Sequence, residues 1–159
     1  MYRPNVGILI INDNKQIFAG HRRNAPAEKG YQMPQGGVES GDNEVDSMYK
    51  ELYEETGLQK KSVELIVQYP KKIRYHFPEY ILIKMKYKYK NNLFLGQEQT
   101  WFILKFIGQE SDINLKIEQK PEFDNWKWLD CEALLKQCIH FKRKTYEEIF
   151  KYCRSLNLL

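Results

Sequence analysis

Apolar side chains along the chain occur in short runs that are typical of strands. Val6–Ile11 is a continuous apolar run and predicts a buried strand, which the turn-forming residues Asp13 and Asn14 follow. Similar runs bounded by polar residues predict further strands at Gln16–Ala19, Val63–Tyr69, Thr100–Ile107 and Trp126–Leu129. These segments together predict a β-sheet.

Tyr80–Lys90 has the most regular pattern of the chain, because every second residue in most of it is basic. The lysines are Lys84, Lys86, Lys88 and Lys90, and they alternate with Met85, Tyr87 and Tyr89. A period of two predicts a strand with one basic face and one apolar face.

Helical spacing is found in other segments. Asn43–Thr56 is rich in helix-forming residues, with Asp42 or Ser40 as the expected N-cap and Gly57 as the expected C-terminal stop. The apolar residues at helical spacing in this segment are Val45, Met48 and Leu52.

The end of the chain predicts two more helices. One is capped by Asp130 and ends near Ile139, and a last amphipathic helix spans Thr145–Leu156. The residues expected to point inward from the last helix are Ile149, Phe150 and Cys153. Because no repeat or linker interrupts these elements, we expect one mixed α/β domain over residues 1–159.

Composition excludes several classes of protein. The chain has 159 residues, 42% of them hydrophobic, which is enough to bury a core and argues against disorder. Neither a signal peptide nor an apolar run of about 20 residues is present, so we expect a cytoplasmic protein that does not enter a membrane. The three cysteines match no metal motif and are expected to be buried or idle thiols. The scattered His21, His76 and His140 are interpreted as structural or surface residues.

Charge is distributed unevenly, although the net charge is only +4. Acidic residues concentrate between Glu39 and Glu64, whereas basic residues are frequent between Lys71 and Lys90 and again from Lys142 to Lys151. This separation predicts either a cation site beside phosphate-attracting surfaces or simply solvated faces.

Three glutamates form the first candidate for chemistry. Glu51, Glu54 and Glu55 have i, i+3, i+4 spacing, so a helix presents them on one arc. They repel one another, and they lie in the last helical turn, where the helix dipole disfavours anions. A bound divalent cation reverses both effects, and oxygen ligands without His or Cys favour Mg²⁺. An acidic solvated helix face is the alternative.

The surrounding segment Gly36–Leu58 closely resembles the Nudix box, a loop–helix–loop motif shared by hydrolases of many substrates. The spacing agrees throughout, and the resemblance implies that Gly36 and the glutamates Glu51, Glu54 and Glu55 contribute to a metal site. Two positions depart from the family pattern, since Asp42 replaces Glu and Lys50 replaces Arg. The family residues form an ion pair that braces the loop, and Lys lacks the planar fork of Arg.

Other stretches extend the resemblance over nearly the whole chain, to bacterial RNA pyrophosphohydrolases and to the overlapping dinucleoside polyphosphate hydrolases. The stretches that carry it are Tyr2–Gly7, Gln32–Gly37, Leu95–Phe102, Pro121–Trp126 with Trp128, and Phe141–Arg143. The resemblance implies the Nudix α/β/α sandwich, in which a mixed sheet lies between helices, with residues 36–58 as the Nudix box.

Candidate substrate-binding residues lie within or near these stretches. Arg3 and Arg22 are suited to clamp phosphate oxygens, although a lone arginine is often only a surface residue. Phe141 is suited to stack on a base and Lys142 to neutralise a phosphate, unless Phe141 is a core residue between helices. The resemblance implies that Glu122 is a further metal ligand or helps to activate water. Glu118, close by in sequence, is the alternative for that role.

The resemblance implies hydrolysis of the 5′-triphosphate of RNA to a 5′-monophosphate with release of pyrophosphate, which initiates mRNA decay. Two or three Mg²⁺ ions, or Mn²⁺ or another divalent cation, would be held by Glu51, Glu54, Glu55 and Glu122, with Glu54 as a bridging ligand. Asymmetric hydrolysis of diadenosine tetraphosphate or pentaphosphate is one alternative, and an inactive RNA-binding module is another. We expect a monomer without haem or nucleotide cofactor.

Overall fold

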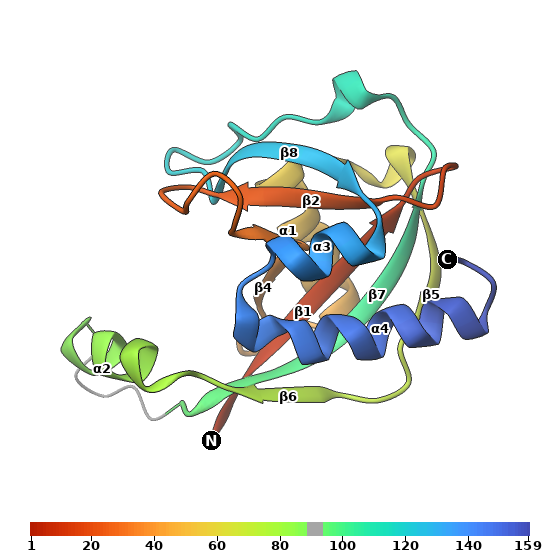
Figure 1. The fold of residues 1–159 in the computed structure, drawn as a ribbon. Helices are drawn as coiled ribbons and strands as arrows, with labels where there is room; N and C mark the ends of the chain where they lie inside the picture. The colour runs from red at the N-terminus through yellow and green to blue at the C-terminus, as the bar shows by residue number, and fades with distance from the viewer. Residues whose placement is uncertain (89–93) are drawn as a thin grey trace.

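The computed structural model describes residues 1–88 and 94–159, and its described strands form one mixed sheet (Figure 1). The central strands β1 (Tyr2–Ile11) and β7 (Gly96–Phe106) run parallel, with Tyr2 opposite Gly96. The path β3-β2-β1-β7-β5 is completed by β2 (Ile17–Arg22), β3 (Tyr31–Gln32) and β5 (Val63–Gln68). Three further strands pair with β1, β7 and β2 respectively: β4 (Gln35–Gly37), β6 (Ile73–His76) and β8 (Phe123–Leu129).

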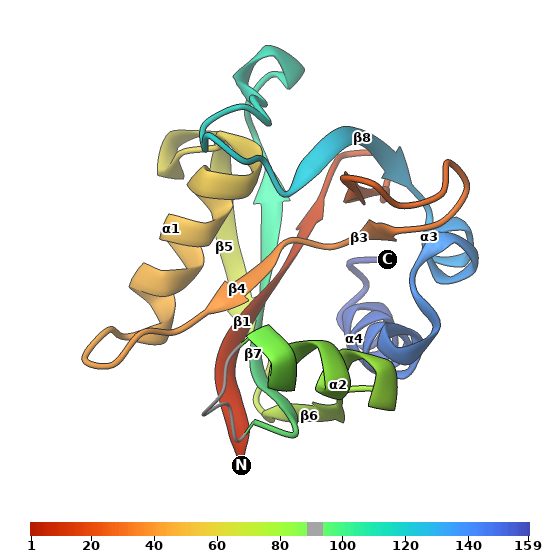
Figure 2. The same cartoon turned by 90° about the vertical axis from the view of Figure 1, so that its left-hand side faces the viewer.

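Helices cover both faces of this sheet (Figure 2). Successive side chains of a strand point to opposite faces, so the apolar run of β1 contributes to two cores. One core contains Val6, Ile8 and Ile10 and packs against α1 (Glu44–Thr56). The other contains Leu9 and Ile11 and packs against α3 (Cys131–Gln137) and α4 (Arg143–Ser155). The predicted α/β/α sandwich is confirmed.

The ends of α1 are set by local backbone chemistry. Asn43 is the N-cap, because its side chain accepts the Asp46 N–H at 2.7 Å; the predicted caps Asp42 and Ser40 were therefore wrong by one and three positions. Gly57 ends the helix with φ 75°, and its N–H donates to the Tyr53 carbonyl at 2.8 Å, as the sequence predicts. Val45 is 38% exposed and lies outside the buried face on which it was predicted.

The two C-terminal helices agree with the sequence. Asp130 caps α3 by accepting the Ala133 N–H at 2.8 Å. In α4, Ile149, Phe150 and Cys153 are buried, as predicted. All three cysteines are buried and free, which also agrees with the prediction. None of the helices in the described ranges has the length and apolar character needed to cross a membrane.

The predicted strand Tyr80–Lys90 is wrong, because Glu79–Lys88 forms helix α2; Lys90 lies outside the described residues. β6 and β7 pair directly with each other, and α2, which lies between them in sequence, is not part of the sheet. The helix starts after Pro78, whose carbonyl accepts the N–H groups of Ile81 and Leu82 at 3.0 and 3.1 Å. The two-residue period of the lysines therefore does not correspond to one face of a strand in this structure.

Candidate active site

A cleft with a volume of about 450 Å³ brings most of the predicted site residues together. Its lining comes from strands β1, β2, β3, β4, β6 and β7, from helices α1 and α2, and from the turn that precedes α4. The predicted residues that line it are Arg3, Arg22, Gly36, Glu51, Glu55, Glu122, Phe141 and Lys142. Glu54 is half-buried on the same helix but does not line the cleft.

The close contact between β4 and α1 positions Glu51. The β4 backbone pairs with β1, and α1 packs its buried face, which includes Met48 and Leu52, against the same sheet. A Cβ added at Gly36 would lie 1.9 Å from Cδ of Glu51. Only glycine therefore allows the carboxyl group of Glu51 to lie against the β4 backbone.

Burial and mutual repulsion raise the pKa values of the three helix glutamates. Burial first, and then the charge of Glu54, raise the pKa of Glu51 to about 7, while Lys50 and Arg3 oppose the shift. Burial raises the pKa of Glu54. The pKa of Glu55 lies well above its usual value because of burial and the charge of Glu51, although its Oε2 accepts the Gln35 N–H at 3.2 Å. The folded chain thus holds like charges together at an energetic cost.

This set of donors has the chemistry that a hard divalent cation requires. Its members are carboxylate oxygens, and each has a raised pKa that a neighbouring cation would lower. Within residues 1–88 and 94–159, however, no three His, Cys, Asp or Glu side chains are gathered tightly enough to hold an ion as they stand. Glu51, Glu55 and Glu122 line one cleft without forming a closed ligand cage.

Glu122 and Glu118 lie near different members of the glutamate set. Glu122 precedes β8, and its Oε1 is 3.6 Å from Nε of Arg22 in the cleft. Its charge contributes to the raised pKa of Glu55. Glu118 instead contributes to the raised pKa values of Glu51 and Glu54, but it does not line the cleft. Glu122 therefore lines the cleft, whereas Glu118 lies outside its lining but close enough to act on the charges of Glu51 and Glu54.

Beside the carboxylates, the cleft has a cationic wall that contains Arg22 and Lys142. Lys142 is only 3% exposed, and its Nζ donates to Oε1 of Gln32 at 2.9 Å. Burial first, and then the charge of Arg22, lower the pKa of Lys142 to about 8, against the opposing effect of Glu55 and Glu122. A buried ammonium group of this kind binds an anion more strongly than a surface lysine does, because the surroundings screen it less.

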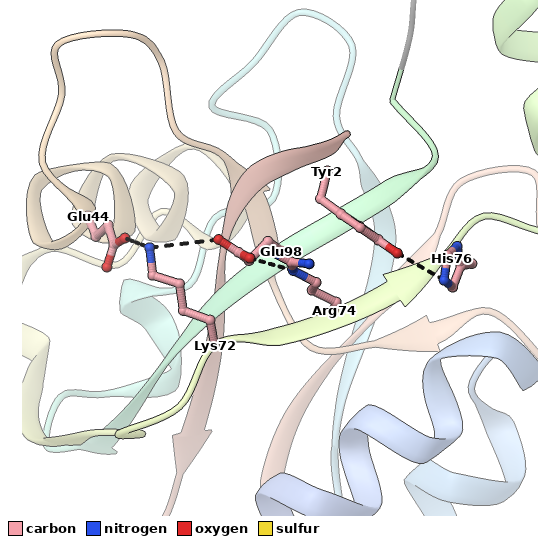
Figure 3. Close-up of polar contacts among 6 residues, drawn as sticks. All are labelled: Tyr2, Glu44, Lys72, Arg74, His76 and Glu98. Carbon is pink, nitrogen blue, oxygen red and sulfur yellow. Dashed lines mark hydrogen bonds and ion pairs between the residues drawn. The ribbon is translucent and has the colours of Figure 1, made fainter.

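Arg3 also reaches the cleft from β1. A Cβ on Gly37 would lie 2.5 Å from Nη2 of Arg3, so the guanidinium group lies directly over the glycine backbone. Nearby ion pairs and hydrogen bonds tie β6 to its surroundings (Figure 3): Nε of Arg74 is 2.6 Å from Oε2 of Glu98, and Nζ of Lys72 is 3.1 Å from Oε1 of Glu44. These contacts connect α1, β6 and β7 beside the cleft.

Aromatic side chains form a third wall. The ring of Phe141 is half-buried and lies 5.8 Å from the ring of Tyr75, which in turn is 5.9 Å from the ring of Phe77. All three residues line the cleft. Phe141 is thus a residue of the cleft wall rather than of the core between two helices, which was the alternative from sequence.

The sequence did not reveal the role of two buried glutamines, Gln97 in the lining of the cleft and Gln99 next to it in β7. Gln97 accepts hydrogen bonds from the Tyr75 hydroxyl at 2.5 Å and from Nε2 of Gln35 at 3.3 Å. Nε2 of Gln99 donates to Oδ1 of Asn5 at 2.7 Å. The alternate spacing of Gln97 and Gln99 in an otherwise buried strand was the signal, since polar residues on one face of such a strand need partners.

Asp42 and Lys50 do not form the ion pair that the motif implies. Both side chains are exposed, and the ion pairs of the described residues include neither of them. The Asp42 N–H donates to the Glu39 carbonyl at 3.0 Å, which closes the loop locally. Lys50 instead favours the ionised forms of Glu51 and Glu54, whose pKa values it lowers.

The effects of Asp42→Glu and Lys50→Arg on stability should therefore be additive. Exposed residues that do not touch give double mutants within about 0.3–0.5 kcal/mol of the sum of the singles. Urea unfolding of the wild type, both single variants and the double variant tests this. Coupling above about 0.5 kcal/mol would show that the two residues meet in solution and brace the loop.

His21 has a carboxylate partner that the sequence analysis did not find. Its Nδ1 lies 2.7 Å from Oδ1 of Asp124, and its Nε2 lies 2.9 Å from the carbonyl oxygen of Pro26. With an acceptor at each nitrogen, both N–H groups of a protonated ring donate. The hydrogen bond to Pro26, and then that to Asp124, raise the pKa of His21 above its usual value, while burial opposes them. The pairing of β2 with β8 shifts register between His21 and Arg22, so this contact sits at a bulge beside Glu122.

The stability that His21 provides should depend on pH. Because its pKa is raised in the folded state, the contribution is fully present below the usual value of 6.5 and is lost as pH rises through the raised pKa. His21→Gln should cost about 1.5–3 kcal/mol at acidic pH, and less as the pH becomes alkaline. Urea unfolding from acidic to alkaline pH measures this cost, with Asp124→Asn as the matched variant of the partner residue. A cost that does not change with pH would contradict the charged form of the ring.

Comparison with known proteins agrees with this architecture. The sequence matches the NUDIX domain family over residues 1–149. It is 38% identical over 150 residues to an RNA pyrophosphohydrolase of Ruthia magnifica subsp. Calyptogena magnifica, which covers 94% of this chain and 80% of that protein. It is 36% identical over 154 residues to an RNA pyrophosphohydrolase of Francisella tularensis subsp. mediasiatica, covering 97% of this chain and 94% of that one.

Solved structures share the fold at much lower sequence identity. The dihydroneopterin triphosphate pyrophosphohydrolase of E. coli superposes with a TM-score of 0.70 at 19% identity, covering 93% of this chain and 96% of that one. A C. elegans Ap4A hydrolase superposes with a TM-score of 0.63 at 14% identity, covering 95% and 98% of the two chains. The chain belongs to the Nudix family.

Proposed function

We propose that this protein is a divalent-cation-dependent RNA 5′-pyrophosphohydrolase, which converts a 5′-triphosphate end to a 5′-monophosphate and releases pyrophosphate. The observation that carries the proposal is the set of side chains that line the cleft. Carboxylates line it together with Arg22 and the buried Lys142, and the ring of Phe141 provides an aromatic surface. A polyphosphate chain attached to a nucleoside would meet cations for its phosphates and a ring for its base there.

The carboxylates have one task in this proposal. Glu51, Glu54, Glu55 and Glu122 would hold Mg²⁺, or another divalent cation, and Gly36 leaves the space in which Glu51 reaches it. The bound cation supplies charge neutralisation of phosphate oxygens and lowers the pKa of a coordinated water. Within the family the Nudix box is associated with divalent cations, and the raised pKa values of these glutamates fit that use.

The remaining residues of the cleft bind and orient the substrate. In this proposal Arg3 and Arg22 donate to phosphate oxygens, and Lys142 adds a buried positive charge. Phe141 stacks on the first base. Fixing the phosphates with respect to the attacking water contributes to catalysis mainly by positioning and by charge neutralisation.

A second pocket adjoins the cleft and would offer contacts to a longer polynucleotide. It has a volume of about 360 Å³, shares Arg22 with the cleft, and carries the basic residues Lys29, Lys136 and Arg143 in its lining. Further phosphates of a polynucleotide would find positive charge there. The proposed protein acts as a monomer in the cytoplasm and starts the decay of mRNA by exposing a monophosphorylated end.

Product analysis tests this proposal. The purified protein is incubated with RNA that carries a labelled 5′-triphosphate, with Mg²⁺ and with excess chelator. We expect pyrophosphate and monophosphorylated RNA with Mg²⁺, and neither product with chelator. Binding of the RNA without any release of pyrophosphate would instead identify an RNA-binding module that lacks catalysis.

Gly36→Ala and its neighbour Gly37→Ala should have different kinetic effects. A methyl group on Gly36 would displace the carboxyl group of Glu51, and a misplacement of about 1 Å can reduce the rate about 10²-fold. A methyl group on Gly37 meets only the flexible end of Arg3, so we expect a higher KM with little change in kcat. Steady-state kinetics separates the two, with thermal unfolding as the control for folding. Equal effects on kcat would contradict the role of Gly36.

A further inference from the structure

Helix α2 presents two different faces. On one side, Ile81 and Met85 line the active-site cleft. On the other, Tyr80, Ile83, Lys84 and Tyr87 are exposed, and their i, i+3, i+4, i+7 spacing places them on one stripe of the helix. We call these four residues the α2 stripe. It is unusually apolar for a free surface, since Tyr80 is 46%, Ile83 49% and Tyr87 85% exposed.

The position of α2 connects this surface with the cleft. Figure 2 shows α2 near the N-terminal end of β1 and near β6, on the side of the sheet that carries β4. Its base is fixed by backbone and side-chain contacts: the Phe77 N–H donates to the Leu95 carbonyl at 2.9 Å, and the Tyr2 hydroxyl lies 2.9 Å from Nε2 of His76 (Figure 3). Because Ile81 and Met85 of α2 line the cleft, RNA that leaves the cleft on this side passes along α2.

The charge of α2 identifies the chemistry of the partner. Its sequence contains three lysines and a single acidic residue, Glu79. In the part of the chain that the structure describes, Lys84 and Lys86 have no ion-pair partner. Exposed tyrosines interleaved with unpaired lysines suit single-stranded nucleic acid, in which bases stack on rings and phosphates meet cations. With a rise of 1.5 Å per residue, Tyr80 and Tyr87 lie about 10 Å apart along the helix axis, far enough to stack on different bases.

We propose that the α2 stripe, together with Lys86, binds the single-stranded RNA downstream of the nucleotides held in the cleft. This inference rests on the proposed function, and it adds a specificity determinant to it. The cleft binds the 5′ end, and α2 contacts the strand that follows, so the enzyme favours longer unpaired RNA 5′ ends over short ones.

Chain length of the substrate provides the test. We would measure kcat/KM with a triphosphorylated dinucleotide and with an unstructured triphosphorylated ten-nucleotide RNA. Tyr80→Ala/Tyr87→Ala should lower the value for the longer RNA about tenfold or more, because base stacking on aromatic residues is lost. Tyr80→Phe/Tyr87→Phe keeps the rings and should restore it. The value for the dinucleotide should stay within about twofold of the wild type in every variant, since stacking beyond the cleft does not involve it.

Salt dependence tests the lysines separately. Lys84→Gln/Lys86→Gln should reduce the slope of log affinity against log salt for the longer RNA by about 1.4, since each lost phosphate contact contributes about 0.7 for a single strand. Lys60→Gln/Lys61→Gln removes the same charge from exposed positions of the short helical segment Lys60–Ser62, which lies at the other end of the molecule from α2, and should not change this slope. Both sets of variants keep residues that are compatible with helices.

Binding of a fluorescent ten-nucleotide RNA with a 5′-monophosphate, measured by anisotropy, separates this inference from the proposed function. If the wild type releases no pyrophosphate from either RNA, the proposed function fails, whatever the binding result. If the wild type and the α2 variants bind the ten-nucleotide RNA equally well, the inference fails, and the stripe serves another partner such as a protein. A loss that is equal for short and long substrates would also overturn it, because α2 would then only shape the cleft.

Discussion

Glu55→Gln should lower kcat/KM about 10³-fold, equivalent to about 4 kcal/mol of transition-state stabilisation. Glu55 lines the cleft and accepts the Gln35 N–H, a hydrogen bond that a glutamine oxygen can also accept. The substitution therefore keeps the shape of the site and removes only a charge that would hold a divalent cation. Steady-state kinetics with triphosphorylated RNA and Mg²⁺ measures the effect.

Stability should change in the opposite direction to activity. The pKa of Glu55 is raised in the folded state, so without divalent cations the ionised carboxylate destabilises the fold at neutral pH and above. Glu55→Gln should raise Tm in chelator, by about 2–4 °C for each kcal/mol, while Mg²⁺ should stabilise the wild type more than the variant. Glu132→Gln removes the same charge from an exposed position and serves as the control. A lower Tm in chelator together with normal activity would identify Glu55 as a purely structural residue.

Lys142→Met should lower kcat/KM about 10²-fold at neutral pH, mainly through KM, because the substrate phosphates lose a buried cation. Methionine preserves most of the apolar stem, so the loss reports the charge rather than the volume. The effect should become smaller above pH 8, since burial lowers the pKa of Lys142 to about 8 and the wild type itself loses the charge there.

The control for this variant is Lys144→Met, which removes an exposed lysine two residues away. Kinetics of both variants and the wild type should be measured at a pH below 8 and at a pH above it. If the ratio of kcat/KM between the wild type and Lys142→Met is the same below and above pH 8, the charge of Lys142 does not act on the substrate. A comparable loss in Lys144→Met would point to general electrostatic attraction instead.

The sequence was sufficient for the architecture because the deciding signals were local. The apolar run Val6–Ile11 is buried on both faces of a central strand, and this is the pattern that a continuous run predicts. Gly57 and Asp130 ended and started their helices as expected. The Nudix box placed Glu51 and Glu55 on α1 because its spacing is a property of one helix and its flanking loop.

The sequence failed where the structure depends on distant partners. Alternating lysines in Tyr80–Lys90 have the period of a strand, but strand formation also depends on pairing and packing with neighbours, and Glu79–Lys88 instead forms α2, whose Ile81 and Met85 line the cleft. The ion pair expected between Asp42 and Lys50 is absent, since each side chain is solvated in this structure. The contact of His21 with Asp124 joins residues 103 positions apart, which no local pattern reveals.

The cleft itself illustrates the same distinction. Phe141 and Lys142 were identified as candidates, but their burial beside Tyr75 and Gln32 follows only from the docking of the turn before α4 onto β3 and β6. The glutamines Gln97 and Gln99 are part of the matching stretch in β7, and their role became visible only with their hydrogen bonds.

The most direct test of the central claim compares two substrates under identical conditions. We would measure kcat/KM for a short triphosphorylated RNA and for diadenosine tetraphosphate with the same enzyme and Mg²⁺. We expect RNA to be the better substrate, because the α2 stripe and the basic pocket that shares Arg22 with the cleft both offer contacts to nucleotides beyond the 5′ end. A preference of tenfold or more for the dinucleotide, about 1.4 kcal/mol, would contradict it and assign the protein to the hydrolysis of dinucleoside polyphosphates.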